Sequence, residues 1–381
     1  MGSRFFLQAL VLTALLPVIA YGKCDFPAIF NFGDSNSDTG GWHFAFPYQM
    51  LPDNAPYGRT FFGQPSYRYS DGRLSVDFLA QALGLPFISP FLQSVGSRFE
   101  QGANFAASGA SVRPTSTDFN APISLTVQLN QFKVFKQQVL DTISSHGSLN
   151  YLPSADSFKT GIYTIEIGGN DFDNAYRSLK LSPLQVKQTI LPKLAKSVGG
   201  AVQELYNEGA RTILVKDVGP QGCGPFWLTY FSHAPTDFDQ HGCSISYNDA
   251  VQFYNTQLRE QLSLVRKQLP GADIVYVSQY DIIYDFFANP SKYGFKATTQ
   301  SCCGVGGKYN FTWAAQCGLT GPVNGKSVTV GSCSDPASYI IWDGIHLTDQ
   351  ANRVLTQQIL GGKYFEPSTF SITSRCQTQP I

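Results

Sequence analysis

The chain has 381 residues, of which 27 are basic and 27 are acidic, so its formal net charge is zero. A chain without net charge has no field of one sign to attract nucleic acid or an acidic membrane surface, and we expect a small neutral molecule as its partner. With 43% hydrophobic and 14% aromatic residues it can bury a large core, and α/β folds of this length often form a single domain.

The first 22 residues have the pattern of a secretory signal peptide. Arg4 stands near the start, an apolar run covers residues 5–20, and the stretch ends in Ala20-Tyr21-Gly22. The apolar run is short for a membrane span and no second one follows it, which disfavours a membrane anchor. We therefore predict a cleaved signal peptide over 1–22, one domain over 23–381, and no integral membrane segment after cleavage.

Short β-rich runs then alternate with long helical patterns. Such alternation predicts βαβ units around a mainly parallel sheet. The predicted strands are Ala28–Phe32, Gln101–Phe105, Gly161–Ile167, Thr212–Val218 and Ala272–Val277.

Apolar residues recur at helical spacing between these strands, over 132–143 and over 190–205. The second of these helices has Ser182 as N-cap, Pro183 at its first position and Gly209 beyond its end, and Pro192 is expected to bend it. These stripes are core positions, and they carry no site.

Two further helices are predicted from the C-terminal half of the chain. One covers about Tyr247–Leu269 and ends at Pro270-Gly271, and the other covers Thr348–Leu360 and ends at two glycines. Both are expected to pack on a face of the sheet. Residues 289–338 are rich in Gly and Cys with weak periodicity, which predicts an irregular segment held by disulfides.

The cysteines favour disulfides, because a secreted chain folds in an oxidising compartment. Zinc is disfavoured, since the adjacent pair at 302 and 303 has no Cys-x-x-Cys spacing and no nearby histidine. Cys223 with Cys243 would close a short loop, the four cysteines from 302 to 333 allow three pairings among themselves, and Cys24 and Cys376 are left to join the chain ends. Asn310 is in the one glycosylation sequon and supports secretion weakly.

Three predicted strands run into small polar turns. These turns are "GDSN", "NFAASGAS" and "EIGGND", and in a parallel sheet ligands bind at the carboxyl ends of the strands. If all three turns face one cleft, the hydroxyl of Ser35 meets the backbone of Gly109 and the side-chain amide of Asn170. That arrangement is a nucleophile with two hydrogen-bond donors.

A serine hydroxyl needs a base to accept its proton. Among the five histidines only His346, in "IWDGIHLT", has a carboxylate three residues earlier, Asp343, which can orient the imidazole. Each of these turns alone is common in proteins. Their order along the chain, an early Ser, a middle Asn and a late Asp and His, is far more specific, and no Gly-x-Ser-x-Gly elbow of the α/β-hydrolases occurs.

Several longer blocks carry a resemblance to a known family. The blocks are "FNFGDSNSDTGG", "PYGRTFF", "RYSDGRLSVDFLA", "GANFAASGA", "EIGGND", "GPQGCGP" and "WDGIHLT". Together they resemble the plant GDSL esterase/lipase family of the SGNH hydrolase superfamily, and most closely its secreted early-nodulin-like and α-fucosidase-like subgroup. The resemblance implies a three-layer α/β/α fold with a short, flavodoxin-like parallel sheet.

The resemblance also implies a role for each candidate residue. Ser35 would be the nucleophile and its N–H the first oxyanion donor, Gly109 and Asn170 would supply the second and third donors, His346 would be the base, and Asp343 would orient it. Two positions depart from the family pattern: Asn36 replaces the Leu of the name motif, and Leu347 stands where Pro is frequent. Neither departure removes a reacting atom, and no metal or organic cofactor is needed.

The expected protein is therefore a secreted, monomeric serine esterase of the cell wall, with the vacuole as an alternative location, that acts on a small-molecule ester. Two alternatives stay open: an acyltransferase that uses the same acyl-enzyme, and a non-catalytic wall or carbohydrate-binding protein. A glycosidase is disfavoured, because that chemistry needs two carboxylates flanking the glycosidic oxygen. The acyl group and the alcohol depend on loops, expected near His43–Tyr57 and Phe226–His241.

Overall fold

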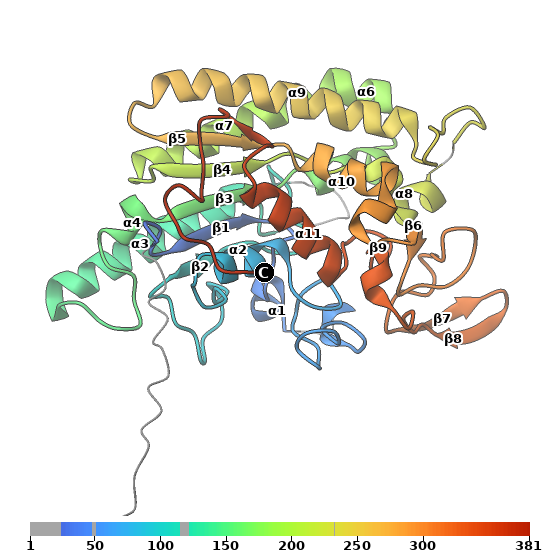
Figure 1. The fold of residues 1–381 in the computed structure, drawn as a ribbon, viewed down its shortest axis with the longest axis horizontal. Coiled ribbons are helices and arrows are strands. Elements are labelled where there is room, and N and C mark those ends of the chain that lie inside the picture. Colours follow the sequence, from blue (N-terminus) through green and yellow to red (C-terminus); the bar gives the residue numbers. More distant parts are fainter. Residues whose placement is uncertain (1–23, 48–50, 115–121, 232) are drawn as a thin grey trace, which may run out of the picture.

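A six-stranded sheet forms the centre of the computed structural model, which describes residues 24–47, 51–114, 122–231 and 233–381 (Figure 1). The strand order is β10, β5, β4, β3, β1, β2, and every neighbouring pair is parallel except β10 with β5. All five predicted strands are present, so the predicted flavodoxin-like sheet is confirmed. The strands are β1 Ile29–Gly33, β2 Gly102–Asn104, β3 Ile162–Glu166, β4 Thr212–Lys216, β5 Asp273–Val277 and β10 Phe365–Glu366.

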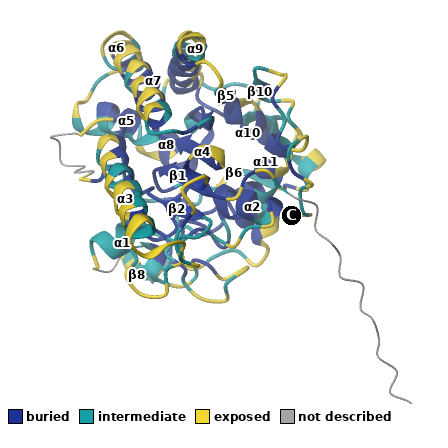
Figure 2. Ribbon diagram, turned by 90° about the vertical axis from the view of Figure 1, so that its left-hand side faces the viewer, coloured by how far each residue is buried: buried dark blue, intermediate teal, exposed yellow. Residues whose placement is uncertain are grey.

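Helices cover both faces of this sheet, because alternate strand residues are apolar on each side. On one face Phe30 and Tyr163 pack against α3 (Leu125–His146), α7 (Leu191–Asn207) and α9 (Ile245–Gln268). On the other face Ile29 and Val275 pack against α2 (Ser75–Ala82), α10 (Gln279–Ala288) and α11 (Asp349–Leu360). Figure 2 shows the buried strands between helices whose outer sides are exposed, which confirms the three-layer α/β/α fold.

The short helices lie mostly in connections around the carboxyl end of the sheet. They are α1 Gly41–Ala45, α4 Ser157–Thr160, α5 Gly169–Asp173, α6 Pro183–Thr189 and α8 Pro225–Tyr230, with a π-helical turn over Asn174–Ser178 and 3₁₀ turns over Leu51–Asp53, Gln221–Cys223, Pro290–Tyr293 and Pro336–Ser338.

The helix predicted from Ser182 to Gly209 is in fact two helices. Ser182 caps α6 as predicted, in a reciprocal pair of hydrogen bonds with Gln185, but α6 ends at Thr189 and α7 begins at Leu191. Pro192 has no N–H to donate to the preceding turn, and the helix is interrupted at Ile190, whose backbone stays in the right-handed helical region. One continuous helix was predicted, and the structure divides it in two at this point.

The segment from 289 to 338 is less irregular than predicted. It contains β6 (Ala297–Ser301), which pairs with β9 (Tyr339–Ile341), and a hairpin of β7 (Thr320–Val323) and β8 (Lys326–Thr329). The hairpin turns at Asn324-Gly325, and both residues have the positive φ angles, 49° and 76°, that a tight hairpin turn requires. Its strands are mostly exposed, so they lack the alternating apolar pattern by which strands are recognised.

All eight cysteines form disulfides. Cys223 pairs with Cys243 and Cys24 with Cys376, as predicted, and the segment cysteines form two bridges among themselves, Cys302–Cys333 and Cys303–Cys317. The structure thereby selects one of the three pairings that the sequence left open.

The predicted signal peptide, 1–22, lies outside the described residues. Within the part of the chain that the structure describes, no helix has the length and apolar character needed to cross a membrane.

Candidate active site

The turn after β1 presents Ser35 at the carboxyl edge of the sheet. Gly33, the last residue of β1, is held by the side chain of Gln128, whose Oε1 accepts from its N–H at 2.9 Å and whose Nε2 donates to its carbonyl at 2.8 Å. The carboxylate of Asp34 then accepts two hydrogen bonds of 3.0 Å from the backbone and the side chain of Asn36. These contacts fix the backbone on both sides of Ser35.

Ser35, His346 and Asp343 form a continuous chain of hydrogen bonds. Ser35 Oγ lies 2.8 Å from His346 Nε2, and His346 Nδ1 lies 2.9 and 2.8 Å from the two carboxylate oxygens of Asp343. All three residues are less than one-tenth exposed. The order hydroxyl, imidazole, carboxylate is the arrangement that lets a histidine accept the proton of a serine.

Asp343 stays ionised in this site. Burial on its own would raise its pKa, but the interaction with His346, the backbone N–H of His346 and the hydroxyl of Tyr57 outweigh burial and lower it. Tyr57 donates to Asp343 Oδ2 at 2.8 Å, and the backbone of His346 donates to Oδ1 at 3.0 Å. A carboxylate held from three sides can keep the imidazole in one tautomer.

Gly109 and Asn170 are brought together at the ends of β2 and β3. Asn170, in α5, donates through Nδ2 to the carbonyl of Ala110 at 2.9 Å, the residue that follows Gly109. One of the two hydrogens of this amide is thereby placed, and the other is available to a further acceptor. Gly109 has φ 74°, a left-handed conformation that favours glycine.

A second contact joins these turns to the turn of Ser35. Asp171 accepts from the backbone N–H of Val112 at 2.9 Å, and the charge of Asp34 is close enough to raise the pKa of Asp171. Burial is the main reason that the pKa values of Asp34 and Asp171 both rise to about 7. The three polar turns therefore lie together, with buried carboxyl groups beside Ser35 and Asn170.

These raised pKa values predict a pH dependence of folding stability. A carboxyl group whose pKa is higher in the folded state stabilises the fold at low pH, and this contribution is lost as the pH rises from about 4 through 7. Asp217, also buried with its pKa raised to about 7, adds to the same trend. We expect the melting temperature to rise when the pH is lowered from 8 to 5, as measured by calorimetry.

Asp217→Asn is the matched variant for this pH experiment, since it removes one titrating group away from Ser35. It should make the pH dependence of the melting temperature shallower. A melting temperature that stays constant or falls between pH 8 and pH 5 would contradict the raised pKa values.

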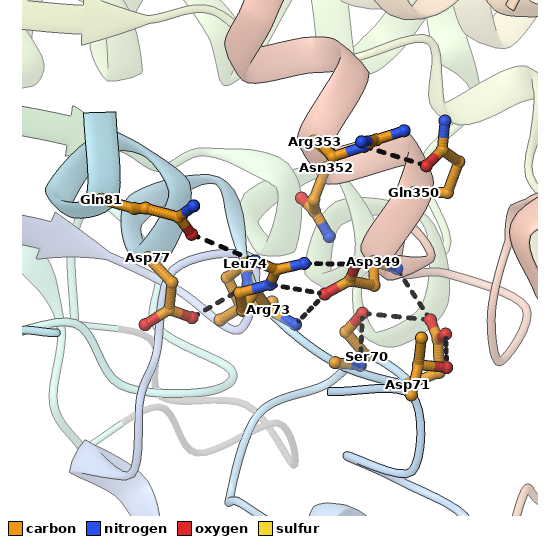
Figure 3. Close-up of polar contacts among 12 residues, drawn as sticks. Ser70, Asp71, Arg73, Leu74, Asp77, Gln81, Asp349, Gln350, Asn352 and Arg353 are labelled. Carbon is orange, nitrogen blue, oxygen red and sulfur yellow. Dashed lines mark hydrogen bonds and ion pairs between the residues drawn. The ribbon is translucent and has the colours of Figure 1, made fainter. Parts of the chain in front are cut away.

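The start of α11, which follows the His346 loop, is joined at Asp349 to a segment that lies more than 270 residues earlier in the chain (Figure 3). The ring of Tyr69 lies 4.7 Å from the ring of His346. Asp349, three residues after His346, forms an ion pair with Arg73, whose Nε and Nη2 each lie 3.1 Å from one carboxylate oxygen. The backbone N–H of Asp349 donates to the carboxylate of Asp71 at 2.7 Å. We call Asp71, Arg73 and Asp349 the Arg73–Asp349 bridge.

The Arg73–Asp349 bridge is partly buried, and further contacts hold the Arg73 side chain in place. The guanidinium of Arg73 lies over the rings of Phe61 and Phe78, 4.0 and 4.2 Å from their centroids, and its Nη1 donates to Gln81. A Cβ atom at Gly72 would collide with the carboxylate of Asp349. The start of α11, and with it the His346 loop, is thus fixed against α2.

Sequence reasoning named Ser35, Gly109, Asn170, Asp343 and His346 but assigned no role to Tyr57, Tyr69 or Arg73. These three residues lie in the quoted blocks "PYGRTFF" and "RYSDGRLSVDFLA", so the resemblance marked their segments without marking their contacts. Asn36, which departs from the family pattern, contacts Asp34 through its side chain.

No metal site was predicted. Among the residues that the structure describes, no group of three or more His, Cys, Asp and Glu side chains is placed to hold a metal ion.

Comparison with known proteins places this site in a family. The model of the family described as GDSL-like Lipase/Acylhydrolase matches residues 29–359. A protein of Arabidopsis thaliana named GDSL esterase/lipase At4g01130 is 42% identical over 376 residues, which are 96% of each chain. GDSL esterase/lipase ENOD8 of Medicago truncatula is 39% identical, over 95% of this chain and 93% of that one. A third relative, named Alpha-L-fucosidase 3, of Arabidopsis thaliana, is 39% identical over 92% of this chain and 95% of its own.

The resemblance inferred from the sequence is confirmed, including its early-nodulin and fucosidase-named relatives. The match covers all the turns described above, from Ser35 to His346. The chain belongs to the family of GDSL-like lipases and acylhydrolases.

Proposed function

We propose that the protein is a secreted serine esterase that hydrolyses carboxylic esters through an acyl-enzyme on Ser35. Membership of the GDSL family, with relatives named esterase or esterase/lipase, makes the protein a carboxylic ester hydrolase. The observation that supports the serine mechanism is the unbroken hydrogen-bond chain from Ser35 Oγ through His346 to Asp343.

In the proposed reaction His346 accepts the proton of Ser35 as the serine oxygen attacks the ester carbonyl. The imidazolium that forms is stabilised by the carboxylate of Asp343, which remains negatively charged. His346 then donates its proton to the departing alcohol. Water attacks the acyl-enzyme by the same route in reverse and releases the acid.

The oxyanion of the tetrahedral intermediate would be stabilised by three donors: the backbone N–H groups of Ser35 and Gly109 and the side-chain amide of Asn170. Two features support this assignment. The amide of Asn170 is anchored at Ala110, beside Gly109, and retains one hydrogen for an acceptor. Donors that are fixed before the reaction need no reorganisation when charge develops.

Asn170→Ala is expected to lower kcat by about 100-fold to 1,000-fold with little change in KM, since the lost donor acts mainly on the transition state. Steady-state kinetics with a 4-nitrophenyl ester measure both constants. Asn174→Ala, one turn further along the chain, serves as a control variant and should retain activity. Unchanged kcat in a folded Asn170→Ala protein would remove Asn170 from the oxyanion hole.

The Arg73–Asp349 bridge is expected to matter for turnover, because it fixes the His346 loop without touching substrate. Arg73→Met should lower kcat about tenfold with KM unchanged, and Arg73→Lys, which keeps one ion pair, should restore part of the loss. The control is Asp77→Asn, which weakens the Arg68–Asp77 pair, a somewhat more buried ion pair in the same segment that has no direct contact with Asp349 among the described hydrogen bonds. If Arg73→Met and Asp77→Asn lower the melting temperature equally and also lower kcat equally, the Arg73–Asp349 bridge has no special part in positioning His346.

An active-site-directed phosphonate tests the proposed mechanism directly. It should label Ser35 stoichiometrically and abolish esterase activity, with the modified peptide identified by mass spectrometry. A binding protein without catalysis would not be labelled. Labelling at a different serine would overturn the assignment of Ser35 even if the protein hydrolyses esters.

Hydrolysis and acyl transfer share the same acyl-enzyme and differ in the acceptor. The proposed hydrolase should release free acid from acetyl, butyryl and hydroxycinnamoyl esters, with or without added polyol or sugar acid. If a new ester forms rapidly and saturably when such an acceptor is present, the protein is an acyltransferase, and the roles of Ser35 and His346 stand.

Secretion, monomeric state and a single domain over 23–381 are part of the same proposal. The four disulfides support folding in an oxidising compartment. In the sequon, Asn310 donates through Nδ2 to the carbonyl of Ser301 at 2.8 Å, which still leaves one amide hydrogen that a glycan could replace. Expression with the native leader, light scattering and mass mapping of Asn310 test these points.

A further inference from the structure

A pocket that is partly open to solvent shares a wall with the candidate active site. The residues directly before and after Ser35 and His346 along the chain all line it: Asp34, Asn36, Ile345 and Leu347. Gly169, which precedes Asn170, is also in the wall. Ser35, Gly109, Asn170 and His346 are not themselves among its lining residues, so the pocket adjoins their turns from the side and continues over the carboxyl ends of β3 and β4.

The deeper part of the pocket is mainly apolar. Ile283 and Phe287 of α10 and Leu355 of α11 line it, together with Val218 and Ile341. These side chains are buried, at 8% exposed or less. Such a lining suits the carbon skeleton of a neutral group.

Two buried hydrogen-bond acceptors in the same walls have no partner among the described residues. They are the side-chain oxygens of Gln221 and Gln279, and Gln279 is only 3% exposed. A buried acceptor that lacks a donor destabilises the folded protein by about 1–3 kcal/mol, so native proteins rarely keep one without a ligand or water.

The orientation of both amides is fixed by their nitrogens. Gln221 Nε2 donates to the carbonyl of Gly169 at 3.0 Å, and Gln279 Nε2 donates to the carbonyl of Asp217. Turning either amide around would place its oxygen against a carbonyl oxygen. The two unpartnered atoms are therefore acceptors, and the missing partner is a donor.

The surroundings favour a neutral donor over a cation. Three carboxyl groups line the pocket. Glu166 is paired with Lys216 at 2.9 Å, Asp34 accepts from Asn36, and Asp217 accepts from the backbone of Tyr280 and the hydroxyl of Tyr276. Because all three already have partners, and because burial raises the pKa of Asp34 and of Asp217 and so favours their neutral forms, the pocket suits a hydroxyl group better than an ammonium group.

We propose that this pocket binds a hydroxyl-bearing part of the ester substrate, whose O–H donates to Gln279 and Gln221. The inference rests on the proposed esterase function and specifies the substrate class of that site. The hydroxyl can belong to the acyl group or to the alcohol.

Matched esters that differ in a single hydroxyl test the proposal. The acyl arm compares methyl 4-hydroxycinnamate with methyl cinnamate, and the alcohol arm compares 2-hydroxyethyl acetate with propyl acetate. In at least one arm kcat/KM should be about tenfold or more higher for the hydroxylated ester, the effect of one hydrogen bond to a buried acceptor. The arm that shows the preference identifies which half of the ester enters the pocket.

Gln279→Met and Gln221→Met each remove one acceptor at nearly constant side-chain length. In each variant the ratio of kcat/KM for the hydroxylated ester to kcat/KM for its matched ester should fall toward one. The fall should come only from slower hydrolysis of the hydroxylated ester. Gln252→Met is the control, because the amide of Gln252 donates to Tyr280 and does not line the pocket. Gln221 is less buried than Gln279, so its variant provides the test if Gln279→Met does not fold.

Hydrolysis of 4-nitrophenyl acetate separates the possible failures. Without turnover of any ester the esterase function itself is wrong. If simple esters are hydrolysed but neither arm shows a preference, or if a preference survives in both glutamine variants, the pocket holds only water and the inference is overturned.

Discussion

Ser35→Ala is expected to reduce ester hydrolysis by about four orders of magnitude or more, and His346→Ala should have a similar effect. Without the serine oxygen no acyl-enzyme forms, and without the imidazole no group accepts the proton of the serine. The two residues act as one unit, so the double variant should be little worse than either single variant. Initial rates with a 4-nitrophenyl ester measure the loss.

Ser37→Ala is the matched control for this experiment. Ser37 lies in the same turn and is also buried, at 1% exposed against 8% for Ser35, but its hydroxyl has no hydrogen-bond partner among the described residues. It should keep activity and melting temperature close to those of the wild type. If Ser35→Ala folds normally and keeps more than about one-hundredth of the activity, the proposed nucleophile is wrong.

Removing the Cys302–Cys333 bridge, by changing both cysteines to serine, is expected to lower the free energy of unfolding by about 2–5 kcal/mol. The bridge joins residues that are 31 positions apart, and its segment is hydrogen-bonded to the strand that precedes Asp343. The backbone of Cys302 donates to Ile341 at 3.0 Å, and that of Cys303 donates to Trp342 at 2.7 Å. Trp342 is fully buried and precedes Asp343, so loosening this contact should also lower kcat.

The Cys24–Cys376 bridge provides the comparison, since it joins the chain ends and has no backbone contact with the Asp343 segment among the described hydrogen bonds. Its removal should destabilise the protein while leaving kcat intact at a temperature where the variant is folded. Chemical denaturation gives the stability of both double variants, and steady-state kinetics give kcat. Equal effects on kcat would show that the bridge at Cys302 acts only through global stability.

Much of the fold follows from patterns that are local in the sequence. The runs at Ile162–Glu166 and Thr212–Lys216 are recognisable because both faces of the sheet are covered, so every residue of these strands is buried and most are apolar. The strands of the β7–β8 hairpin are mostly exposed, and in the sequence only the Asn324-Gly325 turn indicates a hairpin. The break at Ile190 depends on how the hydrogen bonds around Pro192 are rearranged, which periodicity does not encode.

Part of the candidate site could likewise be predicted from the sequence, and part could not. Ser35, Asn170 and His346 could be named because each follows a strand or precedes a helix, and topology brings such positions to one edge of the sheet. Tyr57 and Arg73 reach Asp343 and Asp349 across 286 and 276 residues of sequence. No spacing rule connects positions so far apart, so these supporting contacts became visible only in three dimensions.

The bridge between Cys24 and Cys376 makes the described polypeptide a covalent ring, closed across 352 residues. A protease that cuts once, for example at the exposed Asn324-Gly325 turn, would open this ring without releasing a fragment. The two fragments of the nicked protein would stay joined by disulfides, and they would separate on a denaturing gel only after reduction. Because the disulfide already holds the natural chain ends together, new ends could be made at such a turn without a peptide linker between the natural ones.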